Sequence, residues 1–232
     1  MADLIHRLRR VAQMAGDDRR KQLEHFVRND ARAGRALLEQ SNPRATAEAL
    51  MRMCHTLGFE SEGHARRLLH WCGTLGAAIG LDARALDDLA LGALVHDIGK
   101  LGITAEVLGS ADALTSTELD WIRMHSSLGH ALLAGVPGLG AARTLVLSHH
   151  EYWNGSGYPE GRSGAEIPLP ARVFCLVDSY EAIIREDVVY RPSRAHAAAR
   201  EELLELAGVR YDAELVEAWS RLDSEAWASV AA

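Results

Sequence analysis

One stretch, residues 86–102 with the sequence LDDLALGALVHDIGKLG, constrains the fold of this chain more than any other. Its apolar residues recur at the spacing of one helix face, and Asp97 falls three and four residues beyond the last two of them. His96 lies along the edge of the same face. A carboxylate that points into a core is costly unless a cation meets it, and only Lys100 follows at a suitable offset. This histidine and aspartate therefore predict a metal ion as their partner.

The rest of the chain repeats the helical pattern, and we find no convincing strand alternation. We predict two amphipathic helices over residues 3–15 and 19–40 and a third from about residue 43 to residue 57. The residues that we expect to begin or cap helices are Ser41 or Asn42 with Pro43, Thr115, Pro170 and Asp212. The predicted fold class is all-α, a helical bundle.

The length of the chain suits one sizeable domain with a helical extension. Of its 232 residues 48% are hydrophobic, which is enough for a core of its own. We place the boundary so that residues 1–57 form an N-terminal helical segment and residues 58–232 form the main domain. The generic reading of the N-terminal helices is packing on the main domain or on a second subunit, and ligand sensing is the alternative. A homodimer or a protein partner bound through these helices is therefore expected.

Composition excludes several other classes of protein. The formal charge of −7 disfavours a protein that binds a nucleic-acid polymer through bulk charge. No apolar run reaches membrane-spanning length, and the opening MADLIHRLRR has no signal-peptide core, so we expect a cytoplasmic protein without membrane contact. Cys54, Cys72 and Cys175 lie far apart and form no CxxC pair, which predicts neither disulfides nor a thiolate zinc site.

Five successive predicted helices each direct at least one imidazole or carboxylate toward the core. These eight residues are Glu60, His64, His96, Asp97, His125, His149, His150 and Asp178. Glu60 and His64 stand four residues apart, so we expect them to share one helix face. A single buried histidine is usually structural, but eight ionisable groups on apolar faces would be costly to bury separately. Converged on metal ions, they would compensate one another.

The types of ligand narrow the choice of metal. Imidazoles and carboxylates without thiolates suit Fe, Mn, Zn, Ni or Co, and the share of carboxylates favours iron and manganese. Eight groups exceed what one ion needs, so we expect two or three ions, with Asp97 as a candidate to bridge a pair. Two ions about 3.5–4 Å apart can clamp the oxygens of an in-line displacement at phosphorus. The sequence therefore predicts phosphoester hydrolysis.

Two long motifs and the Glu60/His64 pair resemble the HD-GYP family, a branch of the HD phosphohydrolase superfamily. The motifs are HDIGKLGI at residues 96–103 and HHEYWNGSGYPEG at residues 149–161, and the resemblance runs from about residue 58 to residue 219. It implies an HD-type helical bundle with a di- or trinuclear centre, often of iron. It also implies hydrolysis of cyclic di-GMP or a related cyclic dinucleotide. The same eight residues match the family's metal ligands, with Glu60 at the position associated with trinuclear centres.

The resemblance also implies contacts with the substrate. Lys100 matches the lysine that contacts the scissile phosphate, so we expect Asp97 and Lys100 to carry the catalysis. Tyr158 belongs to the loop that gives the family its name. Tyr152, Trp153 and Tyr158 either wall the base site or only pack the loop, and the sequence leaves both readings open.

The segment after Asp178 departs from the family pattern. It reads DSYEAIIREDVVYR and lacks the usual Arg-Pro pair before the tyrosine. Arg191 still matches the second basic residue of that segment, and Arg185 is a candidate replacement for the missing arginine. Thr104 and Asn154 also stand where proline and aspartate are usual. The metal ligands look complete, whereas the binding of the substrate is altered.

We therefore predict a metal-dependent phosphodiesterase that hydrolyses a cyclic dinucleotide to a linear dinucleotide or to mononucleotides. Cyclic di-GMP is the first candidate substrate. The altered segment motivates an alternative, a regulatory or binding module of the same fold with weak or no turnover. A second alternative is a nucleotide phosphohydrolase of the wider HD superfamily.

Overall fold

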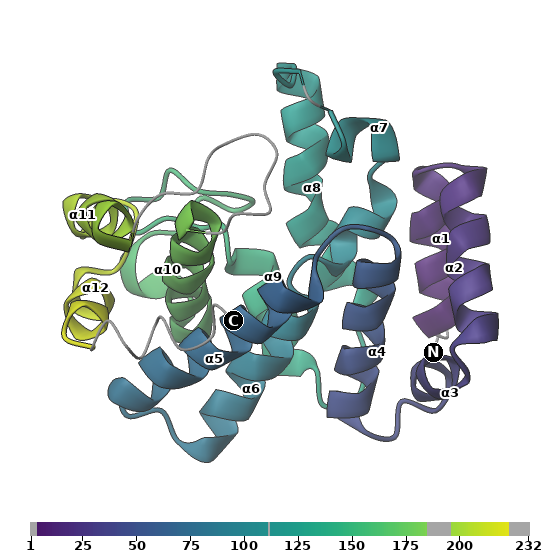
Figure 1. Ribbon diagram of the computed structural model, residues 1–232, viewed down its shortest axis with the longest axis horizontal. Helices are drawn as coiled ribbons and strands as arrows, with labels where there is room; N and C mark the ends of the chain where they lie inside the picture. Colours follow the sequence, from purple (N-terminus) through teal and green to yellow (C-terminus); the bar gives the residue numbers. More distant parts are fainter. Residues whose placement is uncertain (1–3, 111, 185–195, 223–232) are drawn as a thin grey trace.

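The computed structural model describes residues 4–110, 112–184 and 196–222, and these form helices joined by loops (Figure 1). No strand occurs within these ranges, only an isolated bridge between Ala207 and Tyr211, so the predicted all-α class is confirmed. The first helices are α1 (Leu4–Met14), α2 (Asp17–Asn29), α3 (Ala31–Glu39), α4 (Pro43–Thr56), α5 (Glu62–Ala78), α6 (Ala83–Val95) and the 3-10 helix η1 (Ile98–Gly102). The later ones are α7 (Ala105–Leu108), α8 (Ser116–Leu132), α9 (Gly140–Ser148), η2 (Gly164–Glu166), α10 (Leu169–Ile184), α11 (His196–Glu205) and α12 (Ala213–Ser220).

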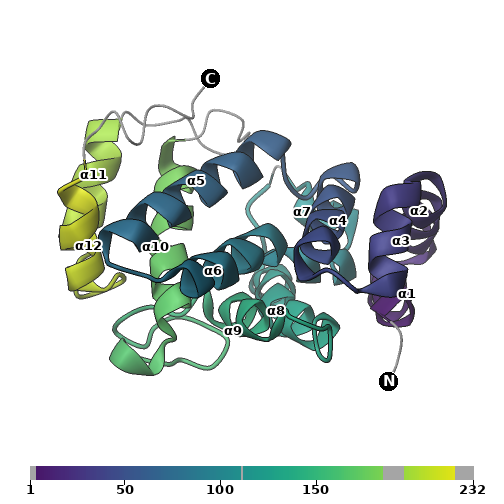
Figure 2. The same cartoon turned by 90° about the horizontal axis from the view of Figure 1, so that it is seen from below.

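The helices form an elongated body with a distinct group at each end. Helices α1–α3 lie at one end and α11–α12 at the other, both in Figure 1 and in the view turned by 90° in Figure 2. Helices α4–α6 and α8–α10 fill the space between them. None of the helices in the described part of the chain is long and apolar enough to cross a membrane.

Two hydrophobic clusters hold this body together. The first joins buried residues of α1–α4 to the end of α6, to η1 and to α9, and it includes Leu8, Leu50 and Ile98. The buried faces of the N-terminal helices thus pack on the main body of the same chain. The second cluster joins α5 and α10 to α11 and α12, and it includes Trp71 and Phe174. Helix α6 contributes Leu94 and Val95 to the first cluster and Leu89 and Ala93 to the second, and residues 96 and 97 follow directly after it.

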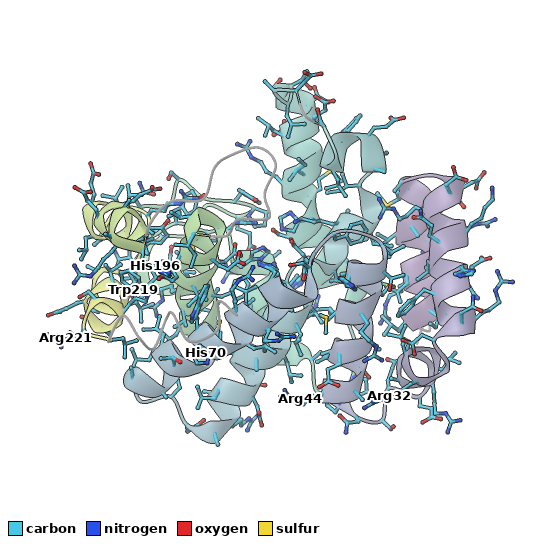
Figure 3. The ribbon with its side chains drawn as sticks, viewed as in Figure 1. Arg32, Arg44, His70, His196, Trp219 and Arg221 are labelled. Atoms are coloured by element: carbon cyan, nitrogen blue, oxygen red, sulfur yellow. The ribbon has the colours of Figure 1, made fainter. Side chains whose placement is uncertain are left out.

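Helices α11 and α12 are attached to α10 through Tyr180. Its hydroxyl lies 2.5 Å from Nδ1 of His196, and its ring centroid lies 5.2 Å from that of Trp219. Figure 3 labels His196 and Trp219 on the side of α11 and α12 that faces α10. These contacts fix the start of α11 and the end of α12 relative to α10.

Several predicted helix starts are confirmed, and each rests on a side-chain cap. Asn42 accepts a hydrogen bond from the backbone of Ala45 and precedes Pro43 at the start of α4. Thr115 and Glu118 form the expected capping box at the start of α8. Asp212 caps α12.

The prediction of one helix over residues 19–40 is wrong, because this segment contains two helices. Asp30 leaves the helical conformation (φ −92°, ψ 86°), and its side chain accepts a hydrogen bond from the backbone of Ala33 at 2.8 Å. An aspartate that caps the following turn ends one helix and begins the next. Leu38, predicted on the apolar face, is 59% exposed for the same reason.

Candidate metal centre

A tight turn after α6 brings the His96–Asp97 pair to the middle of the molecule. The helix ends at Val95, and the 3-10 helix η1 follows directly after Asp97. A Cβ atom at Gly99 would overlap the carbonyl oxygen of His125 and come within 2.7 Å of the backbone nitrogen of Gly129. Glycine at position 99 therefore lets the turn lie against α8, which places Asp97 beside His125.

Three of the predicted ligands are oriented by the helix that carries them. Nδ1 of His96, His125 and His149 lies 2.9, 2.6 and 2.8 Å from the carbonyl oxygen three residues earlier in the chain. A carbonyl can only accept, so Nδ1 carries the proton in each ring and Nε2 keeps its lone pair. Metal-binding histidines are commonly oriented by such a bond to the other ring nitrogen.

His64 instead lies beside a carboxylate from a distant helix. Its Nδ1 lies 2.9 Å from Oε2 of Glu181, and the Glu181 side chain is fully buried. Nε of Arg67 donates to the other oxygen of Glu181 at 3.0 Å. Sequence reasoning missed Glu181, although its position three residues after Asp178 on one helix was a usable signal.

The histidines gather in two clusters. In the imidazole cluster, formed by His125, His149 and His150, one ligand atom from each residue lies within 4.8 Å of the others. Nε2 of His125 and Nε2 of His149 are 3.2 Å apart. The carboxylate cluster, defined by the same criterion, consists of Glu60, His64 and His96. Each cluster offers three ligand atoms, which is enough to hold one ion with open positions.

Asp97 lies between the two clusters. Its Oδ1 is 3.4 Å from Nε2 of His125, and its Oδ2 is 3.4 Å from Nε2 of His96. Nζ of Lys100 donates to Oδ2 as well. One carboxylate therefore faces a histidine from each cluster, which is the geometry that a bridging ligand needs.

Asp178 stands beside the clusters rather than within either. It lines a cavity of about 200 Å³ together with His149 and His150. Burial raises the pKa of its carboxyl group, and the nearby His96 and His64 act in the opposite direction. Its position on α10 is the one that the sequence predicted.

Burial keeps the imidazole cluster neutral. It lowers the pKa of His125, and it lowers the pKa values of His149 and His150 well below their usual range. Neutral imidazoles with a free Nε2 are the form that binds metal ions.

The carboxylates of the centre are only partly balanced by basic side chains. Burial raises the pKa of Glu60, whereas the pKa of Asp97 is well below its usual range because Lys100 and His96 outweigh the effect of burial. Among the described residues of the centre, Glu60, Asp97 and Asp178 face a single lysine. Bound cations would supply the missing positive charge, so the residues present fit a metal site.

The expectation that Glu60 and His64 share a helix face is wrong, although the two residues do meet. Ser61 caps α5 by accepting a hydrogen bond from the backbone of His64 at 3.1 Å, so the helix begins only at residue 62. Glu60 therefore lies in the preceding turn, where its carbonyl oxygen is 3.1 Å from Nδ1 of His55. Its Oε1 comes within 3.8 Å of Nε2 of His96.

The loop after α9 covers one side of the imidazole cluster. The ring centroids of Tyr158 and His150 are 4.8 Å apart. The buried carboxylate of Glu151, which sequence reasoning missed, accepts hydrogen bonds from the backbones of Glu160 and Arg162 at 2.7 and 3.1 Å. Glu151 thus holds the loop over the histidines that precede it.

The aromatic residues of this loop do not share one environment. Tyr152 lines the cavity beside Asp178. The ring of Trp153 instead has the guanidinium of Arg172 over it, 5.7 Å from the centroid. The predicted substrate residues Arg185 and Arg191 lie outside the described residues.

Comparisons with known proteins agree with this geometry. The sequence model of the HD domain family matches residues 37–215. A cyclic di-GMP phosphodiesterase of Thermotoga maritima is 31% identical over 168 residues, which are 72% of this chain and 45% of that protein. A 3'3'-cGAMP-specific phosphodiesterase of Vibrio cholerae is 33% identical over 138 residues, which are 60% of this chain and 31% of that protein. The chain spans less than half the length of these two relatives.

Solved structures show the same fold. A cyclic GMP-AMP-specific phosphodiesterase of V. cholerae superposes with a TM-score of 0.58 at 21% identity, over 73% of this chain and 46% of that one. An HDG"Y"P protein of Bdellovibrio bacteriovorus has a TM-score of 0.55 at 15% identity, over 94% of this chain and 71% of that one. The chain belongs to the HD domain family, as its resemblance to the HD-GYP branch predicted.

Proposed function

We propose that this chain is a metal-dependent phosphodiesterase that hydrolyses a cyclic dinucleotide. Cyclic di-GMP is the first candidate substrate. The observation that carries the proposal is the pair of three-ligand clusters with Asp97 between them. The names of the relatives, cyclic di-GMP and 3'3'-cGAMP phosphodiesterases, support the class of substrate.

The proposed cofactor is a set of two or three metal ions. Iron and manganese are the preferred candidates, and Zn, Ni and Co are the alternatives. The imidazole cluster, the carboxylate cluster, Asp97 and Asp178 together would hold them. The three cysteines are buried and belong to neither cluster, so the donor set consists of nitrogen and oxygen atoms. Bound ions of this kind activate water and stabilise the charge that develops at phosphorus.

The side chains themselves hold and shield the substrate. Lys100 is partly exposed, with 24% of its side chain accessible, and Asp97 holds its ammonium group at the centre. Its remaining N–H groups can donate to a phosphate oxygen, which is the role that the resemblance implies. Tyr158 covers the imidazole cluster and limits the access of water on that side.

The test combines elemental analysis with chromatography of reaction products. Protein prepared anaerobically should contain about two or three ions per chain and should convert cyclic di-GMP to a linear dinucleotide or to GMP. Protein that carries the ions but hydrolyses no cyclic dinucleotide would contradict the proposal. Binding without turnover would favour the regulatory module, and release of inorganic phosphate from mononucleotides would favour the nucleotide phosphohydrolase.

The domain boundary at residue 57 and a partner bound through the N-terminal helices stay predictions. Met14, at the end of α1, is 57% exposed and lines an apolar groove of about 210 Å³ with Trp121 and Met124 of α8. Both α8 residues were predicted on the buried face and are instead about half exposed, since α8 projects beyond the body of the molecule. Sedimentation of the purified chain would show whether it self-associates.

A further inference from the structure

The cavity beside Asp178 extends away from the metal centre to the turn between α11 and α12. Its inner wall is formed by His149, His150 and Asp178, and its outer wall includes Glu202 of α11 and Arg210. It has a volume of about 200 Å³. A substrate whose phosphate lies at the clusters would therefore place the neighbouring nucleoside in this cavity.

Arg210 is held in the cavity wall by aromatic rings. Its guanidinium carbon lies 4.3 Å from the ring centroid of Tyr152 and 5.7 Å from that of Tyr211. Aromatic rings attract a nearby guanidinium through their quadrupoles and restrict its position. The group is therefore oriented before any ligand arrives.

The donors of Arg210 are mostly unused. Nη2 donates to the hydroxyl of Tyr152, whereas Nε is buried without a hydrogen-bond partner. Among the residues that the structure describes, no carboxylate forms an ion pair with Arg210, although Glu202 lines the same cavity. A rigid guanidinium with free donors predicts a ligand that presents acceptors to it.

Guanine presents acceptors that match the donors of Arg210 in this cavity wall. The O6 and N7 atoms of guanine accept two hydrogen bonds from an arginine, whereas adenine presents an amino donor at the corresponding position.

We propose that this cavity is a guanine subsite, in which Arg210 binds the O6/N7 edge of the base next to the scissile phosphate. The subsite rests on the proposed function for its place beside the reacting phosphate. It makes Arg210 a specificity-determining residue that distinguishes a guanine from an adenine substituent.

The experiment compares Arg210→Met and Arg210→Lys with the wild type on cyclic di-GMP, 3'3'-cGAMP and cyclic di-AMP. Arg210→Met should lower kcat/KM for cyclic di-GMP by about 10- to 100-fold, mainly through KM, and should remove the preference over cyclic di-AMP. Arg210→Lys should not restore the preference, because an ammonium lacks the paired donors. Equal losses on all three substrates, or rescue by lysine, would overturn the subsite.

Two controls separate binding from folding. Hydrolysis of bis(p-nitrophenyl) phosphate, which has no purine, should be the same in the wild type and in both variants. Arg200→Met removes an exposed arginine of α11 outside the cavity and should leave the preference for guanine intact. If Arg210→Met does not fold, Arg210→Lys tests the subsite alone, and it should lose the preference for cyclic di-GMP over cyclic di-AMP.

Calorimetric binding distinguishes failure of the subsite from failure of the proposed function. A metal-loaded wild type that hydrolyses nothing, yet binds cyclic di-GMP more tightly than cyclic di-AMP through Arg210, would refute the function and keep the subsite. A wild type that hydrolyses both equally would refute the subsite alone. If the protein binds neither dinucleotide, the subsite and the proposed function are both refuted.

Discussion

The two clusters of the centre differ in the environment of one histidine, His64, since His96 of the carboxylate cluster bonds to a backbone carbonyl as His125 and His149 do. In the imidazole cluster, His125 and His149 bond to carbonyl oxygens of their own helices. In the carboxylate cluster, His64 is held by Glu181, whose other oxygen is bound by Arg67 from a position 114 residues away in the chain. Orientation by the backbone needs only a local helix, whereas orientation by Glu181 needs α5 and α10 to be packed correctly. The carboxylate cluster should therefore be the more easily disturbed of the two.

Replacing Asp97 should have the largest effect, because its two carboxylate oxygens face a histidine of each cluster. We expect Asp97→Asn to lower kcat by about a thousandfold or more and to lower the metal content, since an amide bridges cations poorly. Elemental analysis and turnover of cyclic di-GMP measure both. His130→Asn, on α8 outside the clusters, is the control. Unchanged metal content in Asp97→Asn would contradict the proposal that Asp97 links the two clusters.

Next in size is Gly99→Ala, which adds one methyl group where η1 meets α8. The new Cβ would overlap the His125 carbonyl, so we expect a loss of about 3 kcal/mol or more in the free energy of unfolding. Gly73→Ala is the matched control, because a Cβ there meets nothing within 4 Å in the interior of α5. It should stabilise the protein by about 0.5–1 kcal/mol. Similar denaturation midpoints for the two variants would mean that η1 and α8 are less closely packed than they are in the structure.

Glu181→Gln tests the comparison between the clusters directly. We expect metal affinity at the carboxylate cluster to fall by about 10- to 100-fold, with little change at the imidazole cluster, because only His64 loses its carboxylate partner. Competition with a chromophoric chelator would separate the two sites as successive steps. Arg67→Met is the companion variant, and it should weaken the same step by less. Equal weakening of both binding steps would show that the effect of Glu181 is not confined to the carboxylate cluster.

The smallest effect concerns the caps of the helices that carry the ligands. Ser61→Ala and Asp82→Ala each remove a side-chain cap, from α5 and α6, and each should cost about 1 kcal/mol of stability. Only Ser61 bonds to the backbone of His64, so only its replacement should also lower metal affinity, by a few-fold. A metal titration of the two variants side by side measures this difference. Equal metal affinities would show that the Ser61 cap has no influence on His64 as a ligand.

Much of the centre was predictable because helix periodicity is a local property. His125, His149 and Asp178 fall at helical spacing among apolar residues, so their inward direction follows from a few neighbouring positions. The same holds for the capping box at Thr115. Where a side chain competes with the helix, periodicity misplaces the helix boundaries: Asp30 divides the helix predicted over residues 19–40, and Ser61 begins α5 after Glu60.

By itself, the sequence determined the all-α class and predicted that a set of imidazoles and carboxylates faces the interior, where cations would balance them. Only the tertiary structure decided that these ligands form two clusters with Asp97 between them, that Glu181 orients His64, and that Arg210 lies beside Asp178. The physical reason is distance along the chain. A helix face depends on residues three and four positions apart, whereas these contacts join helices separated by many residues, and packing of the two hydrophobic clusters brings them together.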